Sequence, residues 1–284
     1  MRIVALLVVW LISAVPAARA TPSVPAFDHV VVVMFENKES TRVLGSRDAP
    51  TFRAYAQSHA QLTRYHGVTH PSLPNYLALV SGSTHGIKEN CTACVISAPT
   101  IADTIEASGR TWKTYAEGLP RPGFTGAASG RYAKKHNPLV YFRSIASNAA
   151  RRRAGIVPFT ELARDLREAR LPEFSLVIPD MCNSTHDCRL AVGDRWLRKL
   201  VPKLEKLPNT VVFVVFEEGT TRARGGGHVP AIALGSAVLP RSRYRAVANH
   251  YGLLRTIEEA WDLPLLGRSA RASPITGIWR ESTG

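Results

Sequence analysis

Three apolar runs in this chain each end next to an acidic residue, and this feature restricts the possible folds more than any other. The runs are rich in valine, isoleucine and phenylalanine, and they are bounded by polar residues: Phe27–Phe35, Phe174–Pro179 and Asn209–Phe216. An uninterrupted apolar run of this length is typical of a strand that is covered on both faces. A shorter run, His228–Leu234, predicts a fourth strand.

Helical patterns separate these strands. Apolar residues recur every three or four positions, or cluster in short segments, at Pro50–Gln61, at Ile101–Ala107, at Arg189–Leu207 and after Asn249, which we expect to cap the last helix. Alternating strands and helices predict an α/β fold, a three-layer α/β/α sandwich around a mostly parallel central sheet. Ligands of such folds bind beyond the carboxyl ends of the strands.

Acidic and amide residues follow the strands at that edge of the predicted sheet. Glu36 and Asn37 follow the first run, Asp180 follows the second, and Glu217 and Glu218 follow the third. Carboxylates that share a desolvated cleft repel one another unless a cation or protons offset their charge. Oxygen ligands with histidine suit a divalent metal ion. The alternative is that these are ordinary solvated loop carboxylates.

The stretch THPSLPNYLALVSG, from Thr69 to Gly82, predicts a buried helix that begins near Ser72. Pro74 is tolerated in a first helical turn. The hydroxyl of Ser72 would then lie at a helix N-terminus, where free backbone N–H groups and the helix dipole favour an anion such as phosphate. Two interpretations remain open: Ser72 caps the helix, or Ser72 reacts with a phosphate bound there.

Several histidines lie close to the predicted strand ends. His186 stands beside Asp187, His228 follows three glycines, and His136 lies in the segment KKHNP. A histidine taken singly is more often structural or merely exposed than functional. Their number beside strand ends favours a site.

The first twenty residues resemble a secretory signal peptide. An early arginine precedes an apolar stretch, and Ala18, Arg19 and Ala20 have the small-x-small form of a cleavage site. We therefore expect a secreted or extracytoplasmic protein cleaved near Ala20, with residues 21–284 forming a single domain. A retained anchor and two smaller domains are the alternatives.

Four cysteines form two close pairs, Cys91 with Cys94 and Cys182 with Cys188. In a cytosolic protein the first spacing would suggest metal binding or redox chemistry, whereas export favours two local disulfides.

The formal net charge is +14, and it falls to +12 when Arg2 and Arg19 leave with the predicted signal peptide. A basic protein favours anionic partners in general. Lys134, Lys135 and the triplet 151–153 could attract a phosphoinositide or an anionic membrane face, or they could be solvated charges.

Eight motifs occur in an order that resembles one bacterial family. In sequence they read HVVVVMFEN, THPSLPNYLALVSG, YAKKHNP, VIPDMCNSTHDC, GDRWL, VVFEEG, GGHVP and HYGLLRTIEEAWDLP. Together they resemble the phosphoesterase family of acid phosphatases and phospholipases C, and most of all its short secreted acid phosphatases that act as phosphatidylinositol-3-phosphatases. The resemblance runs from Phe27 to Trp279 and implies an alkaline-phosphatase-like fold.

The resemblance also implies roles for individual residues. Ser72, just before Pro74 and Asn75, matches the family's nucleophile, and the family usually has Asp-Glu where this chain has Glu217 and Glu218. The implied catalytic residues are Ser72, His70, Asn75, His136 and His186. The implied ligands of a divalent metal ion of unknown identity are Glu36, Asn37, Asp187, Glu217, Glu218 and His228.

We therefore predict a secreted acid phosphatase that hydrolyses phosphate monoesters through a phosphoserine. Its expected partners are phosphorylated small molecules or phosphoinositides such as phosphatidylinositol 3-phosphate, with peripheral contact to an anionic membrane and no nucleic acid. The alternatives are a phosphodiesterase of the phospholipase C type and, more remotely, a non-catalytic binder of anionic lipid or nucleic acid.

Overall fold

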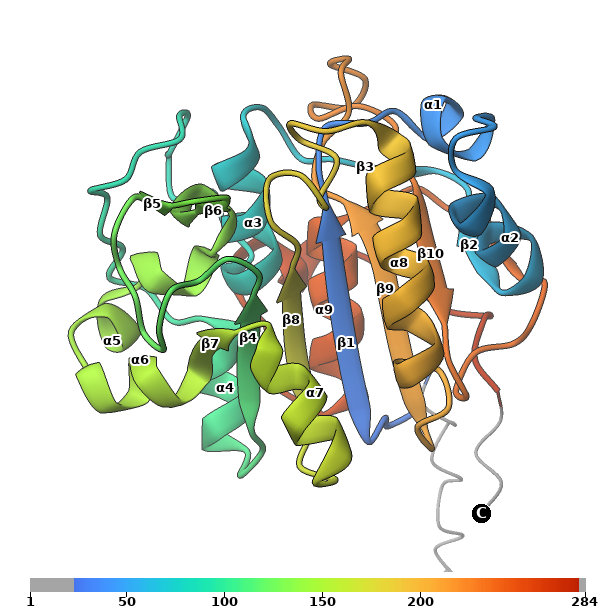
Figure 1. The fold of residues 1–284 in the computed structure, drawn as a ribbon. Helices are drawn as coiled ribbons and strands as arrows, with labels where there is room; N and C mark the ends of the chain where they lie inside the picture. The colour runs from blue at the N-terminus through green and yellow to red at the C-terminus, as the bar shows by residue number, and fades with distance from the viewer. Residues whose placement is uncertain (1–22, 281–284) are drawn as a thin grey trace, which may run out of the picture.

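An eight-stranded sheet organises the part of the chain that the computed structural model describes, residues 23–280 (Figure 1). In spatial order its strands are β11 (Arg243–Tyr244), β2 (Ala60–Leu62), β10 (Ala231–Leu234), β9 (Thr210–Phe216), β1 (His29–Phe35), β8 (Phe174–Ile178), β4 (Trp112–Ala116) and β7 (Ile156–Pro158). The predicted signal peptide, residues 1–20, lies outside the described residues.

The four predicted strands are confirmed as β1, β8, β9 and β10, and the mostly parallel sheet is confirmed with them. β1 lies between β8 and β9 and is parallel to both, whereas β10 is antiparallel to β9. Phe35 at the end of β1 is in register with Phe216 at the end of β9. Glu36 and Glu217 therefore leave the sheet side by side.

The sequence analysis missed the short strands at both edges of the sheet. β4 and β7 extend the sheet beyond β8, and β2 and β11 extend it beyond β10. These segments have two to five residues, and β4, with the sequence WKTYA, contains a lysine. Short edge strands carry too few apolar residues to form a recognisable run.

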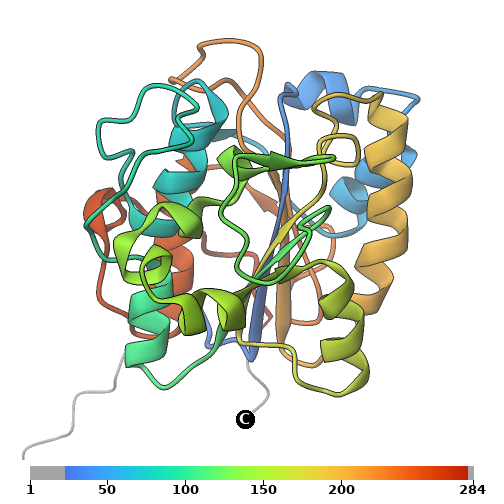
Figure 2. The same cartoon turned by 60° about the vertical axis from the view of Figure 1, so that its left-hand side comes forward.

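Helices cover both faces of the sheet, as the sandwich prediction requires (Figures 1 and 2). One layer contains α3 (Ser72–Ser81), α4 (Ile101–Ala107) and α9 (His250–Ala260), and the other contains α2 (Pro50–Ser58), α7 (Thr160–Arg167) and α8 (Leu190–Leu204). Figure 2 shows α3 and α9 on one side of the sheet and α8 on the other. Three shorter helices are α1 (Ser40–Leu44), α5 (Arg143–Ala146) and α6 (Ala149–Gly155).

The predicted helices are confirmed, with small differences at their ends. α2 stops at Ser58 because the chain enters β2 at Ala60, and α4 has its predicted bounds. Asn249 caps α9 as expected, since its Oδ1 accepts the backbone N–H of Tyr251 at 3.0 Å. Within residues 23–280, no helix has the length and apolar character needed to cross a bilayer.

Both predicted disulfides are present. Cys91 is bonded to Cys94 and Cys182 to Cys188. The second bond closes the loop that follows β8, and Asp180 supports the same loop by accepting the backbone N–H groups of Cys182 at 2.9 Å and Asn183 at 2.8 Å. Asp180 therefore stabilises this loop and does not contact the acidic residues at the ends of β1 and β9.

Glu258 in α9 makes the stability of the protein depend on pH. Its side chain is fully buried, one of its oxygens has no hydrogen-bond partner, and burial raises its pKa from 4.5 to about 7. As pH rises from 4.5 to about 7, Glu258 loses its proton in the unfolded state before it does so in the folded state. The free energy of unfolding therefore decreases over this pH range.

We expect Glu258→Gln to remove this loss. Relative to the variant, the wild-type protein should lose about 2 to 3 kcal/mol of stability between pH 5 and pH 8. Urea unfolding at both pH values measures the difference, with Glu259→Gln as the matched control on the neighbouring residue. Equal pH dependence in the wild-type protein and Glu258→Gln would contradict this assignment.

Candidate active site

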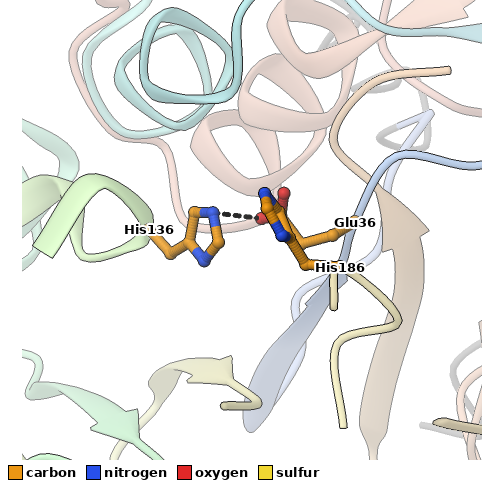
Figure 3. A group of neighbouring side chains, drawn as sticks. All are labelled: Glu36, His136 and His186. Carbon is orange, nitrogen blue, oxygen red and sulfur yellow. Dashed lines mark ion pairs between the residues drawn. The ribbon is translucent and has the colours of Figure 1, made fainter. Parts of the chain in front are cut away.

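Glu36 is the centre of the candidate site at the carboxyl end of β1. It is fully buried, and both of its oxygens face side chains from elsewhere in the chain. Oε1 lies 3.1 Å from Nε2 of His136 (Figure 3) and accepts the hydroxyl of Tyr76. Oε2 lies 3.3 Å from Oγ of Ser72. One carboxylate therefore connects the predicted nucleophile to a histidine.

The surroundings keep Glu36 ionised although it is buried. Burial raises its pKa, but the charge of His136 and hydrogen bonds with His136, Glu217 and Tyr76 lower it further, to about 2. Glu36 is therefore a permanent negative charge that is itself shielded from solvent, and that charge favours a positive partner.

Glu217 lies beside Glu36 at the end of β9 and is also fully buried. Its Oε2 accepts the backbone N–H of Asn37 at 3.0 Å, whereas its Oε1 has no hydrogen-bond partner among residues 23–280. Burial and the negative charge of Glu36 raise the pKa of Glu217 well above its usual value. Two adjacent carboxyl groups in one dry cleft cannot both stay ionised without a cation.

Glu218 connects Ser72 to His70. Its Oε1 lies 3.4 Å from Oγ of Ser72, and its Oε2 lies 2.6 Å from Nδ1 of His70. Burial raises the pKa of Glu218 to about 7, against the opposing charge of His70. Nε2 of His70 donates to the carbonyl of Thr221 at 2.8 Å, because a carbonyl oxygen only accepts.

Ser72 is the first residue of α3, and the structure contradicts its interpretation as a helix cap. The residue in the capping position is Pro71, and no side chain makes the cap hydrogen bond. The Ser72 hydroxyl instead faces Glu36 and Glu218, at 3.3 and 3.4 Å, and its single proton bonds one of them at a time. The serine thus lies at a helix N-terminus with its oxygen directed at the acidic residues.

Asn75, expected as a catalytic residue, makes its hydrogen bonds to the backbone of the loop before α3. Its Oδ1 accepts the backbone N–H groups of Val68 at 2.8 Å and Thr69 at 3.1 Å. Its Nδ2 donates to the carbonyls of Thr69 at 2.8 Å and Pro71 at 3.2 Å. Because both amide protons bond the backbone, this buried side chain shapes the loop that presents Ser72.

His136 and His186 lie together on the side of Glu36 away from Glu218. The ring of His136 is buried and stacks on Tyr76, with centroids 5.4 Å apart. The centroids of the two histidine rings are 5.6 Å apart. One potential ligand atom from each of Glu36, His136 and His186 falls within 4.8 Å of the others.

These residues fit a divalent cation. Carboxylate oxygens and imidazole nitrogens are the donor set that zinc and manganese accept. Within residues 23–280, Oε1 of Glu217 is buried without a hydrogen-bond partner and has an unused lone pair. Nε2 of His136 faces Oε1 of Glu36 at 3.1 Å and would offer its lone pair to a cation once it is deprotonated. Glu36, His136 and His186 would hold the ion, with the free oxygen of Glu217 beside Glu36.

Two residues expected as metal ligands contact the site indirectly. The backbone N–H of Asn37 bonds Glu217. Asp187 is 58% exposed, and its Oδ1 lies 2.6 Å from Nδ1 of His186. This carboxylate orients the histidine, as carboxylates behind ligand histidines commonly do.

His228, also expected in the metal set, faces a different part of the molecule. Its Nε2 donates to the carbonyl of Thr63 at 3.0 Å, and its ring lies 5.2 Å from that of His66. His66 and His228 form an antiparallel bridge, which places both rings on the same face. The backbone pairing therefore directs His228 to His66 and not to Glu36.

Two residues of the site were missed in the sequence. Tyr76 follows Asn75 and lies four residues after Ser72, so helical spacing places it on the same face of α3. Lys38 follows Glu36 and Asn37, and its Nζ donates to the carbonyl of Thr185 at 2.9 Å. Burial lowers the pKa of Lys38, while the charges of Glu217 and Glu36 oppose this effect.

Part of the basic surface predicted from the sequence is engaged within the protein. Arg151 forms ion pairs with Asp103 at 2.8 Å and Glu106 at 3.0 Å. Arg152 donates to the carbonyl of Gly123 at 2.9 Å. These two arginines hold α6 in place, and only Arg153 of the triplet is exposed.

Comparison with known proteins identifies a family and a fold. The model of the phosphoesterase family matches residues 42–264. The phosphatidylinositol-3-phosphatase of Mycobacterium tuberculosis is 33% identical over 281 residues, which cover 97% of this chain and 91% of that protein. An acid phosphatase of Aspergillus fumigatus is 32% identical over 78% of this chain, and the match spans about half of the fungal protein, 53%.

Solved structures show the same fold at low sequence identity. A protein of the alkaline phosphatase superfamily from Vibrio parahaemolyticus has a TM-score of 0.61 and 15% identity, with 88% of this chain and 71% of that chain covered. This chain therefore shares its fold, a mostly parallel sheet between two helical layers, with that structure.

Proposed function

Because the chain belongs to the phosphoesterase family, we propose that it is a phosphatase that hydrolyses phosphate monoesters through a phosphoserine formed on Ser72. One observation carries this proposal. The hydroxyl of Ser72 lies at the N-terminus of α3 with Glu36 and Glu218 at 3.3 and 3.4 Å. A nucleophile, proton acceptors and an anion-binding helix end thus occur at one point.

The first chemical step forms a bond between Oγ of Ser72 and phosphorus and breaks the bond from phosphorus to the leaving alcohol oxygen. The proton of Ser72 passes to Glu218, because Glu36 already accepts from Tyr76 and pairs with His136. Glu218 and His70, 2.6 Å apart, together hold the proton that Ser72 loses and the leaving oxygen gains.

The second step releases inorganic phosphate. Water attacks phosphorus and gives a proton to the Glu218–His70 pair, the bond from phosphorus to Oγ breaks, and Ser72 takes a proton from the same pair. The N-terminal end of α3 stabilises negative charge on the phosphoryl oxygens in both steps. A divalent cation held by Glu36, His136 and His186 would add positive charge beside those oxygens.

Phosphoinositides are the proposed physiological class of substrate. The relative from Mycobacterium tuberculosis is named a phosphatidylinositol-3-phosphatase, and the present chain carries a formal charge of +14 that favours anionic lipid surfaces. We further propose that residues 21–284 form one phosphoesterase domain that is exported after cleavage near Ala20. The two disulfides support an extracytoplasmic location.

Release of inorganic phosphate from a panel of esters tests this function. We expect turnover of p-nitrophenyl phosphate and of phosphatidylinositol 3-phosphate, and little turnover of p-nitrophenyl phosphocholine. Treatment with EDTA should lower the rate about tenfold or more, and zinc or manganese should restore it.

The same assay separates the alternatives. Faster hydrolysis of the phosphocholine diester than of the monoester would indicate a phosphodiesterase of the phospholipase C type. Binding of the lipid without release of phosphate would contradict an enzymatic function.

A further inference from the structure

Lys135 occupies an unusual position next to the candidate site, between Lys134 and His136 in a short 3-10 helix. Its Nζ lies 2.9 Å from Nε2 of His186. An ammonium group only donates hydrogen bonds, so Nε2 of His186 supplies the lone pair, and a cation bound to His186 would take this lone pair and release the ammonium group. Nδ1 of His186 then carries the proton and donates it to Asp187 at 2.6 Å, which fixes the tautomer.

The charge of Lys135 has no carboxylate partner. Among residues 23–280, no Asp or Glu oxygen forms an ion pair with its Nζ. The side chain is half-buried, and the group that holds it, a neutral imidazole, does not cancel its charge. Such an ammonium group is available to an anion that enters the site.

Lys134, the lysine next to Lys135, contacts groups outside the candidate site. Nζ of Lys134 donates to the carbonyl of Thr92 at 2.6 Å and lies 4.8 Å from the centre of the Tyr141 ring. Two consecutive lysines therefore point to different surroundings. Lys134 fixes the loop that carries the Cys91–Cys94 disulfide, whereas Lys135 is directed at the candidate site.

A short series of contacts leads from Lys135 to the nucleophile. Lys135 contacts His186, whose ligand atom lies within 4.8 Å of those of His136 and Glu36. Oε2 of Glu36 is 3.3 Å from Oγ of Ser72. Figure 3 shows the rings of His136 and His186 converging on the Glu36 carboxylate.

A phosphoryl group that enters this site needs positive charge on more than one side. It arrives next to the ionised Glu36, and the other lysine of the site, Lys38, donates to the carbonyl of Thr185. Repulsion between buried like charges is costly unless a cation offsets it. The helix end of α3 supplies partial charge on one side only.

We propose that Lys135 is a phosphate-binding residue whose ammonium group contacts the non-bridging oxygens of the phosphoryl group on the side of His186. A compact ammonium ion on a flexible stem suits such a contact. The ligand chemistry is a tetrahedral oxyanion, either free phosphate or the phosphate of an ester. The inference rests on the proposed function for the position of the substrate.

Binding of inorganic phosphate to the Ser72→Ala protein tests the inference without turnover. Calorimetry in this background should show that Lys135→Met weakens phosphate binding about tenfold to a hundredfold. Lys134→Met is the matched control and should change the dissociation constant less than twofold. Melting temperatures of both variants show whether the fold is intact.

Kinetics with Ser72 intact separate phosphate recognition from a structural or membrane role. Lys135→Met should raise KM by a similar factor for p-nitrophenyl phosphate and for phosphatidylinositol 3-phosphate in vesicles, and Lys135→Arg should restore part of the loss. An effect confined to vesicles would overturn the inference, because it would assign Lys135 to the lipid surface.

Two results of the calorimetry would also overturn the inference. One is equal phosphate affinity in Lys135→Met and Lys134→Met, and the other is the absence of phosphate binding when Lys135 is intact. Failure of the proposed function gives a different result: a phosphoserine would not form on Ser72, while the effect of Lys135 on phosphate binding would persist.

Discussion

Replacing Ser72 by alanine will abolish phosphate release while leaving the protein folded. The change removes the only atom of this side chain that can attack phosphorus, and it keeps the Cβ that packs at the start of α3. Loss of a catalytic nucleophile lowers kcat by about 10³-fold to 10⁶-fold in comparable hydrolases. The residual rate would come from binding and charge stabilisation alone.

Two measurements check this prediction. Steady-state phosphate release gives kcat, and acid quenching of the wild-type enzyme during turnover should trap phosphate on the peptide that contains Ser72. Ser81→Ala is the matched control, because Ser81 is in the same helix and its hydroxyl only bonds the carbonyl of Leu77, the carbonyl of Ser83 and the ring of His85. If Ser72→Ala retained near wild-type activity, Ser72 would not be the nucleophile.

Replacing Glu36 by glutamine should have the second largest effect. The substitution keeps the shape of the side chain but removes a charge that is present down to a pH of about 2. One carboxylate contacts Ser72, Tyr76 and His136 at once, so all three lose the negative charge of their common partner. We expect kcat to fall about 10²-fold to 10⁴-fold, as for removal of one catalytic electrostatic group.

Glu36→Gln should also weaken cation binding, which can be measured without turnover. Calorimetric titration of zinc or manganese into the Ser72→Ala protein should give a dissociation constant that rises about tenfold or more when Glu36→Gln is added. Glu161→Gln is the control, because Glu161 lies on α7 and its ion pair within residues 23–280 is with Arg164. Unchanged kcat and unchanged cation binding in Glu36→Gln would show that Glu36 neither supports catalysis nor binds the cation.

Much of the fold could be predicted because burial leaves a pattern along the chain. β1, β8 and β9 are buried on both faces, and their valine-rich runs stand out from the surrounding residues. The edge strands β2, β4, β7 and β11 were missed, since two to five residues pair at the border of the sheet without forming such a run. Their pairing depends on the neighbouring strand more than on their own composition.

The site was predicted less completely than the fold, because its polar side chains contact residues that are distant in the sequence and that only folding brings close. Glu36, Ser72 and Glu218 do converge as the strand ends and the helix start predicted. His228 does not join them, because a backbone bridge pairs it with His66. The Asn75 amide bonds the chain around it, and nothing in the motif distinguishes that from a bond to phosphate.

By itself, the sequence determined the central strands, the helix that begins at Ser72 and the two local disulfides. Each of these depends on residues close together in the chain, through apolar runs, helix-start signals and short cysteine spacing. Only the tertiary structure decided that Glu36, Tyr76, His136 and His186 form one cluster with Lys135 beside it. These residues come from four separate segments, and a hydrogen bond or ion pair acts over a few ångströms of space regardless of distance along the chain.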